Sequence, residues 1–169
     1  MNAHRTIGLA FATTALFLVL AGCSTAPSVY RGTAPVGSAD VPSQISQAQE
    51  DDITIYAIGL VGTPYRFGGN TPVSGFDCSG LIAYVYQNRS GVVPPRTVAR
   101  MQDWGMPVSG GSIRAGDLVL FLQGNSATHA GIYVGDGRFV HAPSTGGEVR
   151  LDSLNSKYWA SQQVAFRRP

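Results

Sequence analysis

The second half of the chain consists of short apolar or alternating runs separated by turn residues. From Asp117 onward the runs are residues 117–122, 129–134, 138–142, 148–151 and 163–167. The segments between them contain Gly124-Asn125, Gly135-Asp136-Gly137 and Gly146-Gly147. Short runs bounded by such residues predict strands joined by tight turns. We therefore expect an antiparallel sheet in this half of the chain.

The part of the chain before Asp117 predicts helices. Asp51 and Asp52 precede the apolar stretch 53–60 and suit a helix N-terminus, because acidic side chains are favourable there. The run 81–86 predicts a buried helix, although its β-branched and aromatic residues also suit a strand. Residues 97–104 predict a third, shorter helix. Helices followed by an antiparallel sheet predict an α+β fold.

The first 49 residues are predicted to lie outside the folded domain. The apolar run 7–21 is shorter than the roughly 20 residues of a membrane span and fits the core of a signal peptide. It ends in Leu20-Ala21-Gly22-Cys23, which resembles a bacterial lipobox. We expect a signal peptide over 1–22 and a lipid on Cys23; the alternative is an ordinary signal peptide with a chance cysteine. Ser24, rather than Asp, follows Cys23, which in a Gram-negative host indicates sorting to the outer membrane, facing the periplasm.

Composition indicates where the folded domain begins and which partners it has. Residues 23–49 are rich in Ser, Thr, Ala, Pro, Gly and Gln and predict a lipidated, flexible tether, so that the domain spans 50–169. A chain of 169 residues that is 44% hydrophobic supports one globular domain. The net charge of +2 comes from scattered basic residues and does not indicate a partner of nucleic acid. A monomer is the default expectation.

Cysteine and histidine are scarce, which narrows the choice of reactive residues. If Cys23 carries a lipid it cannot form a disulfide, and Cys78 is then a single thiol in an oxidising compartment. If 81–86 is helical, Cys78 lies in the first helical turn, where backbone N–H groups and the helix dipole would stabilise a thiolate. His4 would be lost with the signal peptide, which leaves His129 and His141 in the predicted sheet.

The spacing of the two histidines can be compared with strand geometry. A three-residue turn at Gly135-Asp136-Gly137 places His141 opposite Gly131, with His129 two residues away on the same face. A two-residue turn shifts the register by one and places the histidines on opposite faces. Cooperation between them therefore requires the first register or a bulge. In the first register, Ile132 and Val140 pair on the other face.

A thiol beside two histidines predicts nucleophilic catalysis. Cys78 would attack a carbonyl carbon, and His129 would take the thiol proton and pass it to the leaving amine. His141 would orient His129, and the backbone N–H of Cys78 would face the oxyanion. Two other interpretations of the residues alone stay open. Cys78 and the histidines could be structural, or they could bind zinc, although no fourth ligand is apparent.

Six motifs follow one another in the predicted domain and cover nearly all of residues 53–151. They are Thr63-Pro64-Tyr65-Arg66-Phe67-Gly68-Gly69, Phe76-Asp77-Cys78-Ser79-Gly80-Leu81, Pro95-Arg96-Thr97, Gly116-Asp117-Leu118-Val119-Leu120-Phe121, His129-Ala130-Gly131-Ile132-Tyr133-Val134-Gly135 and Phe139-Val140-His141-Ala142-Pro143. Together they resemble the NlpC family of cell-wall cysteine peptidases. The resemblance implies a papain-like core, in which a helix bearing the cysteine packs on a small antiparallel sheet bearing the histidines. It also implies hydrolysis of amide bonds in peptidoglycan stem peptides, commonly between D-glutamyl and diaminopimelyl residues, or at cross-links.

The resemblance also implies residue roles. Cys78 matches the nucleophile, His129 the base and His141 the orienting residue, and no metal or cofactor is implied. The candidate substrate-binding residues are Tyr65, Asp77, Ser79 and Arg96. Each of three has a simpler alternative: packing for Tyr65, helix capping for Asp77 and a surface ion pair for Arg96. Asp117 is interpreted as a turn residue, and Trp104, Trp159 and Tyr133 as packing residues.

Two other functions remain open at this point. The same fold could act as an amidase or acyltransferase on another acyl substrate, with the same three residues. The chain could also be an inactive lipoprotein that binds wall peptides or scaffolds wall enzymes, for which a free thiol would have no purpose.

Overall fold

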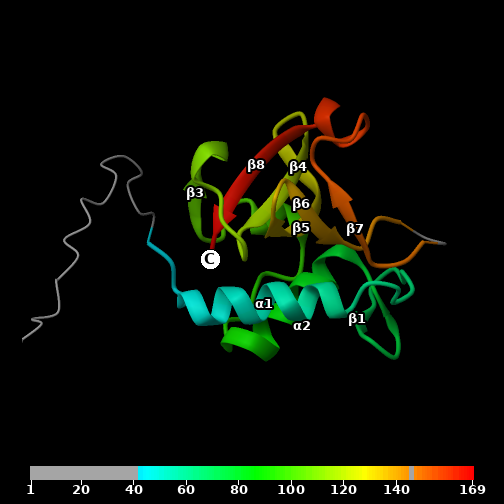
Figure 1. The fold of residues 1–169 in the computed structure, drawn as a ribbon. Coiled ribbons are helices and arrows are strands. Elements are labelled where there is room, and N and C mark those ends of the chain that lie inside the picture. Colours follow the sequence, from blue (N-terminus) through cyan, green and yellow to red (C-terminus); the bar gives the residue numbers. More distant parts are fainter. Residues whose placement is uncertain (1–41, 145–146) are drawn as a thin grey trace, which may run out of the picture. The chain divides into compact units, whose positions relative to one another are not determined.

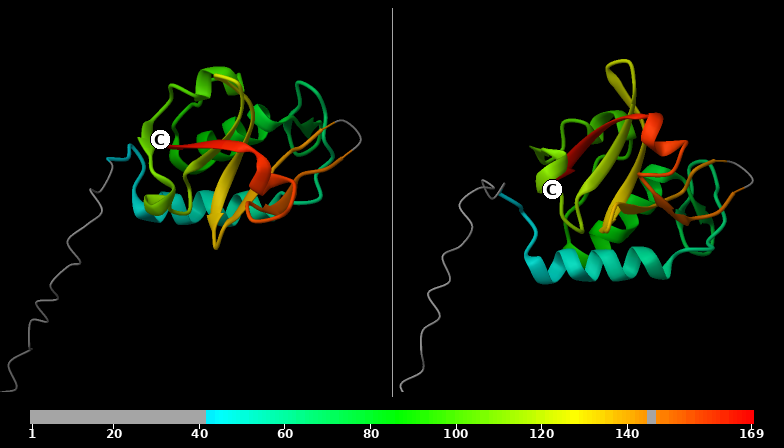
Figure 2. Two further views of the ribbon diagram at one scale, coloured as in Figure 1. Left: turned by 90° about the horizontal axis from the view of Figure 1, so that it is seen from above. Right: turned by 45° about the horizontal axis from the view of Figure 1, so that its top comes forward.

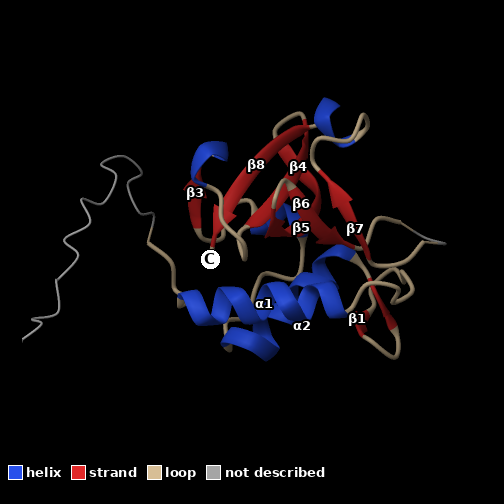
Figure 3. Ribbon diagram, in the orientation of Figure 1, coloured by secondary structure: helices blue, strands red, loops and turns tan. Residues whose placement is uncertain are grey.

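Helices come first in the domain and the main sheet follows (Figures 1 and 3). The computed structural model describes residues 42–144 and 147–169. The helices are α1 (Gln47–Gly59), α2 (Cys78–Ser90) and the short α3 (Val98–Met101). Each corresponds to one of the helices expected from the sequence, and the order of elements confirms the α+β class.

Six antiparallel strands form the main sheet in the order β3-β8-β4-β5-β6-β7. The strands are β3 (Met106–Val108), β4 (Leu118–Gln123), β5 (Ser126–Gly135), β6 (Arg138–His141), β7 (Arg150–Ser153) and β8 (Gln163–Arg168). The five expected strands are present, but β7 begins two residues later than the run 148–151. Strand β3 was not expected from the sequence, nor was a small hairpin of β1 (Asn70–Thr71) and β2 (Gly75–Phe76).

The two faces of the sheet carry separate apolar clusters. On one face, α1 and α2 pack against the central strands, with side chains such as Ile53, Leu81 and Ile132 fully buried between them (Figure 2). On the other face, Val119, Phe121 and Phe139 form a smaller cluster that includes Trp159, from the 3₁₀ helix η2 (Trp159–Ser161). Side chains alternate between faces along a strand, so His129 and His141 belong to the second face.

Helix α2 is defined by a cap at each end. The Asp77 carboxylate accepts a hydrogen bond from the backbone N–H of Gly80 at 2.6 Å, which caps the N-terminus. Gly91, with φ 73°, ends the helix in the left-handed conformation that glycine adopts without strain. These caps explain why the run 81–86 is a helix although its residues also suit a strand.

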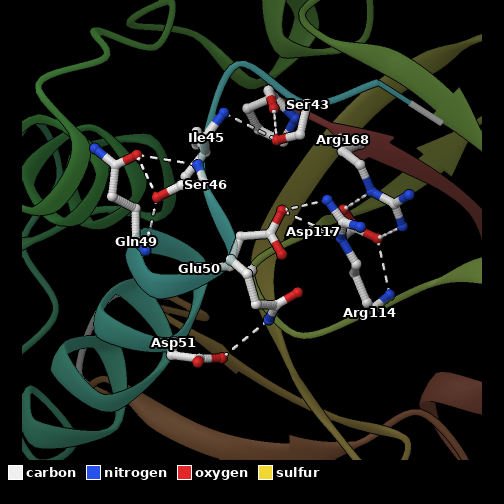
Figure 4. Close-up of polar contacts among 12 residues, drawn as sticks. Ser43, Ile45, Ser46, Gln49, Glu50, Asp51, Arg114, Asp117 and Arg168 are labelled. Atoms are coloured by element: carbon white, nitrogen blue, oxygen red, sulfur yellow. Dashed lines mark hydrogen bonds and ion pairs between the residues drawn. The ribbon is translucent and has the colours of Figure 1, made fainter. Parts of the chain in front are cut away.

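Helix α1 begins earlier than the sequence analysis expected. Ser46 caps it and forms a capping box with Gln49, and the preceding Ile45 is 4% exposed (Figure 4). The Ser43 hydroxyl donates a hydrogen bond to the carbonyl oxygen of Pro169 at 2.7 Å. Residues 43–49 are therefore part of the folded domain, and the expected boundary at residue 49 falls inside a helix. The overlooked feature was the Ser-x-x-Gln pattern that marks a capping box.

Two buried carboxylates, one on α1 and one just before β4, form ion pairs with arginines. Arg114 contacts Glu50 of α1 at 2.6 Å, and Arg168 of β8 contacts Asp117 at 2.8 Å (Figure 4). Asp117 is 1% exposed and also accepts the backbone N–H of Arg114. Its interpretation as a turn residue was therefore incomplete, because its carboxylate also forms a buried ion pair. In the part of the chain that the structure describes, no helix is both long and apolar enough to cross a membrane.

The β5–β6 hairpin contains the bulge that is needed to place both histidines on one face of the sheet. Its turn has two central residues, Asp136 and Gly137, with Gly135 paired to Arg138. A bulge between Tyr133 and Gly135 then shifts the register, so that Ile132 pairs with Val140 as expected. The bulge thus restores the register in which the two histidines share a face.

Candidate active site

Cys78 is the first residue of α2, and Asp77 fixes the backbone around it. One Asp77 oxygen accepts hydrogen bonds from the Ser79 hydroxyl and the Gly80 N–H, and the other accepts the N–H of Gly68 at 2.9 Å. A side chain at Gly80 would place its Cβ 1.9 Å from the carbonyl oxygen of Gly69. The loop before the helix therefore sits directly on the helix start and holds the partly buried thiol in place.

The two histidines are joined by a hydrogen bond. Nε2 of His129 lies 2.8 Å from Nδ1 of His141, and the two rings meet edge to face. His141 is completely buried. Cys78 lies close to His129, because the backbone N–H of the next residue, Ala130, is near enough to lower the pKa of the thiol.

A carboxylate that the sequence analysis did not single out continues this chain of contacts. Oδ2 of Asp152, on β7, lies 3.0 Å from Nε2 of His141. Trp159 donates its indole N–H to the same oxygen at 2.9 Å, and Arg150 contacts the other oxygen at 2.8 Å. The expected strand ended at residue 151, so Asp152 was not placed beside His141. Alternation along the strand places Arg150 and Asp152 on one face, but it does not show which residue of β6 they approach.

Trp159 forms one wall beside the histidines. Its ring stacks on His129 at 5.8 Å between centroids and meets His141 edge to face at 5.1 Å. It also packs on Phe121. The interpretation of Trp159 as a packing residue is confirmed, but its indole N–H contributes a polar contact as well.

An open groove of about 820 Å³ runs along this face of the sheet. Its lining includes His129, His141, Arg150, Asp152, Tyr158 and Trp159. The two histidine rings are thus reached from solvent through a channel with both polar and aromatic walls. A groove of this kind suits an extended polar chain.

Burial and local charge keep both reacting groups neutral in the free protein. Burial and the charge of Asp77 raise the pKa of the Cys78 thiol. The backbone N–H groups of Ser79, Cys78 and Ala130 lower it, but by less, so the pKa lies above its usual value. Burial, and to a smaller extent His141, lowers the pKa of His129 to about 3. The backbone N–H groups at the helix start thus lower the pKa of the thiol, as the sequence predicts, but burial outweighs them and the net shift of the pKa is upward.

The histidine partner is also neutral at neutral pH. Burial lowers the pKa of His141, although the hydrogen bond to Asp152 and the charge of that carboxylate act in the opposite direction. For Asp152, burial would raise the pKa, but hydrogen bonds from Trp159, Arg150 and His141 together leave it below its usual value. An ionised Asp152 thus faces the neutral imidazole of His141, which is in turn hydrogen-bonded to the neutral imidazole of His129.

The candidate substrate-binding residues differ in how close they lie to Cys78. Tyr65 is half-buried, and its pKa is raised by burial and by the charges of Cys78 and Asp77, so its hydroxyl is within electrostatic range of the thiol. Ser79 is 7% exposed and donates its hydroxyl proton to Asp77, and both Asp77 oxygens accept from the protein. Arg96 is exposed before α3 and has no ion pair with any described residue. The expected lipidation site, Cys23, lies outside the described residues.

Within residues 42–144 and 147–169, no group of three or more His, Cys, Asp or Glu side chains is arranged to hold a metal ion. The zinc interpretation therefore has no geometric support in this part of the chain.

The profile of the NlpC/P60 family matches residues 62–168, which is more than half of the chain. The chain belongs to the NlpC/P60 family. The matched segment contains Cys78, both histidines and Asp152. This confirms the family that the sequence motifs resemble.

Curated members of the NlpC/P60 family include close relatives from Escherichia coli strain K12. The chain is 34% identical to the protein named murein DD-endopeptidase MepS/murein LD-carboxypeptidase over 168 residues, which is 91% of this chain and 88% of the relative. It is 42% identical to murein DD-endopeptidase MepH over 112 residues, 64% of this chain but only 41% of that longer relative.

A solved NlpC/P60 structure also matches. The NlpC/P60 domain of the peptidoglycan hydrolase SagA superimposes with a TM-score of 0.61 and 33% identity, covering 69% of this chain and 96% of that domain. Together with the helix and sheet arrangement, this match confirms the papain-like NlpC/P60 fold.

Proposed function

We propose that this chain is a cysteine endopeptidase that hydrolyses amide bonds in peptidoglycan stem peptides or in their cross-links. The observation that carries the proposal is the thiol of Cys78 at a helix N-terminus, close to the hydrogen-bonded pair His129 and His141, which lines an open groove. The names of both relatives from Escherichia coli, which refer to murein endopeptidases, support peptidoglycan as the substrate.

In this proposal the reaction proceeds in two acyl-transfer steps. As Cys78 attacks the scissile carbonyl carbon, His129 takes the thiol proton, so that charge develops only when substrate is present. The backbone N–H of Cys78 is one of the first four of α2, which lack partners within the helix, and it stabilises the oxyanion. His129 passes its proton to the leaving amine as the carbon–nitrogen bond breaks. Water, deprotonated by His129, then hydrolyses the thioester and restores the thiol.

The neighbouring residues have supporting roles. His141 orients His129, and the Tyr65 hydroxyl lies close enough to the thiol to contact bound substrate. Asp77 and Ser79 act through the shape of the loop and the helix start, because their polar atoms bond to the protein. Arg96, which is exposed and has no ion-pair partner among the described residues, is assigned to a carboxylate of the stem peptide.

The experiment compares the whole chain, purified in detergent, with its Cys78→Ala variant on purified peptidoglycan fragments, with the products identified by mass spectrometry. We expect the first to release defined peptides and the second to release none. If both bind the fragments and neither cuts, the non-catalytic wall-binding function replaces this proposal. If only a different acyl substrate is cleaved, the amidase or acyltransferase function replaces it.

We further propose that the protein is exported and held at the cell envelope by a lipid on Cys23, with residues 1–22 removed. The support is the apolar run that ends in the lipobox-like Leu20-Ala21-Gly22-Cys23. Metabolic labelling with an alkyne-bearing palmitate should mark the wild-type chain and leave a Cys23→Ala variant unmarked. Equal labelling of both chains would show that the lipid is elsewhere.

A further inference from the structure

Asp152 is placed beside the histidine pair by the pairing of β6 with β7. In this ladder Phe139 lies opposite Asp152, and His141 lies opposite Arg150. Residues two apart on a strand share a face, so Arg150, Asp152 and His141 all face the second side of the sheet. The carboxylate therefore meets His141 from the neighbouring strand, on the side away from His129.

Every contact of the Asp152 carboxylate is with a donor. Oδ2 accepts from the indole N–H of Trp159 at 2.9 Å and faces Nε2 of His141 at 3.0 Å. Oδ1 accepts from Nε of Arg150 at 2.9 Å. The Asp152 side chain is only 15% exposed, so it is held in one orientation by three side chains. An ionised carboxylate can only accept hydrogen bonds, and Nε2 of His141 must therefore carry its proton.

The tautomer of His141 determines the tautomer of His129. A neutral imidazole has one N–H, so with the proton on Nε2, Nδ1 of His141 is an acceptor. The 2.8 Å contact is then donated by the Nε2–H of His129. Nδ1 of His129 is left without a proton, and no other described residue hydrogen-bonds to it. That nitrogen is the one that can take the proton of the thiol.

We infer that Asp152 is a positioning residue of the active site, which fixes the tautomers of His141 and His129 so that His129 presents a basic nitrogen to Cys78. This inference rests on the proposed function and extends its set of three residues by a fourth. Trp159 and Arg150 support it by holding the carboxylate. Without that carboxylate, His141 is free to place its proton on Nδ1, and His129 then presents N–H to the thiol and cannot act as a base.

The Asp152→Asn variant tests this directly. Asn has one oxygen in place of two, so it cannot accept from Arg150 as well as from Trp159 and His141. Whenever its NH₂ group faces His141, both hydrogen bonds of the histidine pair reverse. We expect kcat on peptidoglycan fragments to fall by about 10- to 1,000-fold, while KM changes by less than about twofold, because Asn keeps the size of the side chain in the groove lining and alters the base. The matched control is Asp136→Asn, which removes an exposed carboxylate in the β5–β6 turn and should leave kcat unchanged.

A second measurement reads the tautomers themselves. In the whole chain labelled with ¹⁵N-histidine, the wild-type rings of His129 and His141 should carry the proton on Nε2, and in Asp152→Asn a part of both should carry it on Nδ1. Asp152→Ala has no group that donates or accepts a hydrogen bond, so it should give a mixture of the two tautomers. This variant replaces Asp152→Asn if Asp152→Asn does not fold. Near-ultraviolet circular dichroism establishes that each variant is folded.

Three outcomes would overturn the inference: an unchanged kcat in Asp152→Asn, a lost kcat with wild-type tautomers, or wild-type rings that carry the proton on Nδ1. A different result concerns the proposed function alone. If the wild-type chain cleaves no peptidoglycan fragment, the peptidase function fails, and the ¹⁵N spectra still decide whether Asp152 sets the tautomers.

Discussion

The environment of Cys78 combines opposing influences on one thiol. Burial and the neighbouring Asp77 favour the neutral form, whereas three backbone N–H groups favour the thiolate. The balance raises the thiol pKa and, with the low pKa of His129, gives a neutral resting pair. The thiolate of Cys78 and the imidazolium of His129 therefore form during the reaction and not before it.

This balance predicts how fast Cys78 reacts with iodoacetamide as pH changes. Only the thiolate is nucleophilic, so the rate should still be rising above about pH 8.5, the usual pKa of a free cysteine. Rates measured from pH 5 to 10 on the wild-type chain would show this, with Cys78→Ala giving the background from other sites. A rate that levels off below about pH 7 would instead indicate a thiolate–imidazolium pair.

The low pKa of His129 also predicts acid sensitivity. The folded protein holds this ring neutral down to about pH 3, whereas the unfolded chain protonates it near 6.5. Between these values the unfolded state binds more protons, so this contribution to stability is complete above pH 6.5 and is lost as pH falls toward 3. The free energy of unfolding should fall between pH 7 and pH 4 in both the wild type and His129→Gln. We expect the fall to be smaller by at least about 1 kcal/mol in His129→Gln, which lacks this ring.

Urea unfolding at both pH values measures this difference, because all carboxylates that titrate in this range are common to the two proteins. An identical pH dependence in the wild type and His129→Gln would contradict the buried, neutral state of the ring.

At the scale of elements, the β5–β6 hairpin determines whether the histidines meet. Asp136 has φ 51° and Gly137 has φ 69°, which are the two positive values of a tight two-residue hairpin turn. That turn alone would place the histidines on opposite faces, and the bulge after Tyr133 corrects it. The geometry of the site therefore depends on one extra residue in β5.

Gly131 lies where β5 and β6 approach each other beside His141. A Cβ at Gly131 would lie 2.7 Å from a ring carbon of Phe139 and 3.2 Å from the Cβ of His141. Gly131→Ala should displace His141 and lower kcat/KM by about tenfold, because small misplacements of catalytic groups are costly. The control is Gly111→Ala, where a Cβ has open space. Unchanged kinetics and an unchanged melting temperature in Gly131→Ala would show that the strands adjust without moving His141.

At the scale of the whole domain, contacts distant in sequence join its beginning to its end. Ser43 bonds to Pro169, Glu50 of α1 pairs with Arg114, and Asp117 pairs with Arg168 of β8. These contacts lie outside the groove and serve to hold the elements together. They also explain why the folded domain begins before residue 50.

Removing the carboxylate of the buried pair should therefore reduce stability and not activity. Asp117→Asn leaves the 3%-exposed Arg168 guanidinium facing a neutral amide and should cost about 3–5 kcal/mol in the free energy of unfolding. Asp136→Asn, which breaks an exposed pair, should cost less than about 1 kcal/mol. Denaturant unfolding measures both values. A kcat per folded molecule that also falls in Asp117→Asn would show that this pair influences the site.

Local patterns in the sequence predicted much of this domain. Motif order indicated the family, strand alternation placed the histidines in one sheet, and the position of Cys78 before an apolar run placed it at a helix start. The start of α1 was missed because the composition of residues 43–49 resembles a tether, although Ser46 and Gln49 carry a local capping signal. These features depend on neighbours in the sequence, and they can therefore be inferred from it.

Other features depend on contacts between distant segments and needed the tertiary structure. Strand alternation could not show that Asp152 approaches His141, because the register of β6 with β7 is set by packing across the sheet. The direction of the Cys78 pKa shift likewise depends on how deeply the folded core buries the thiol. The sequence by itself thus determined which residues could react, whereas the tertiary structure decided their protonation and their partners, because desolvation and hydrogen bonding arise only when separate elements pack together.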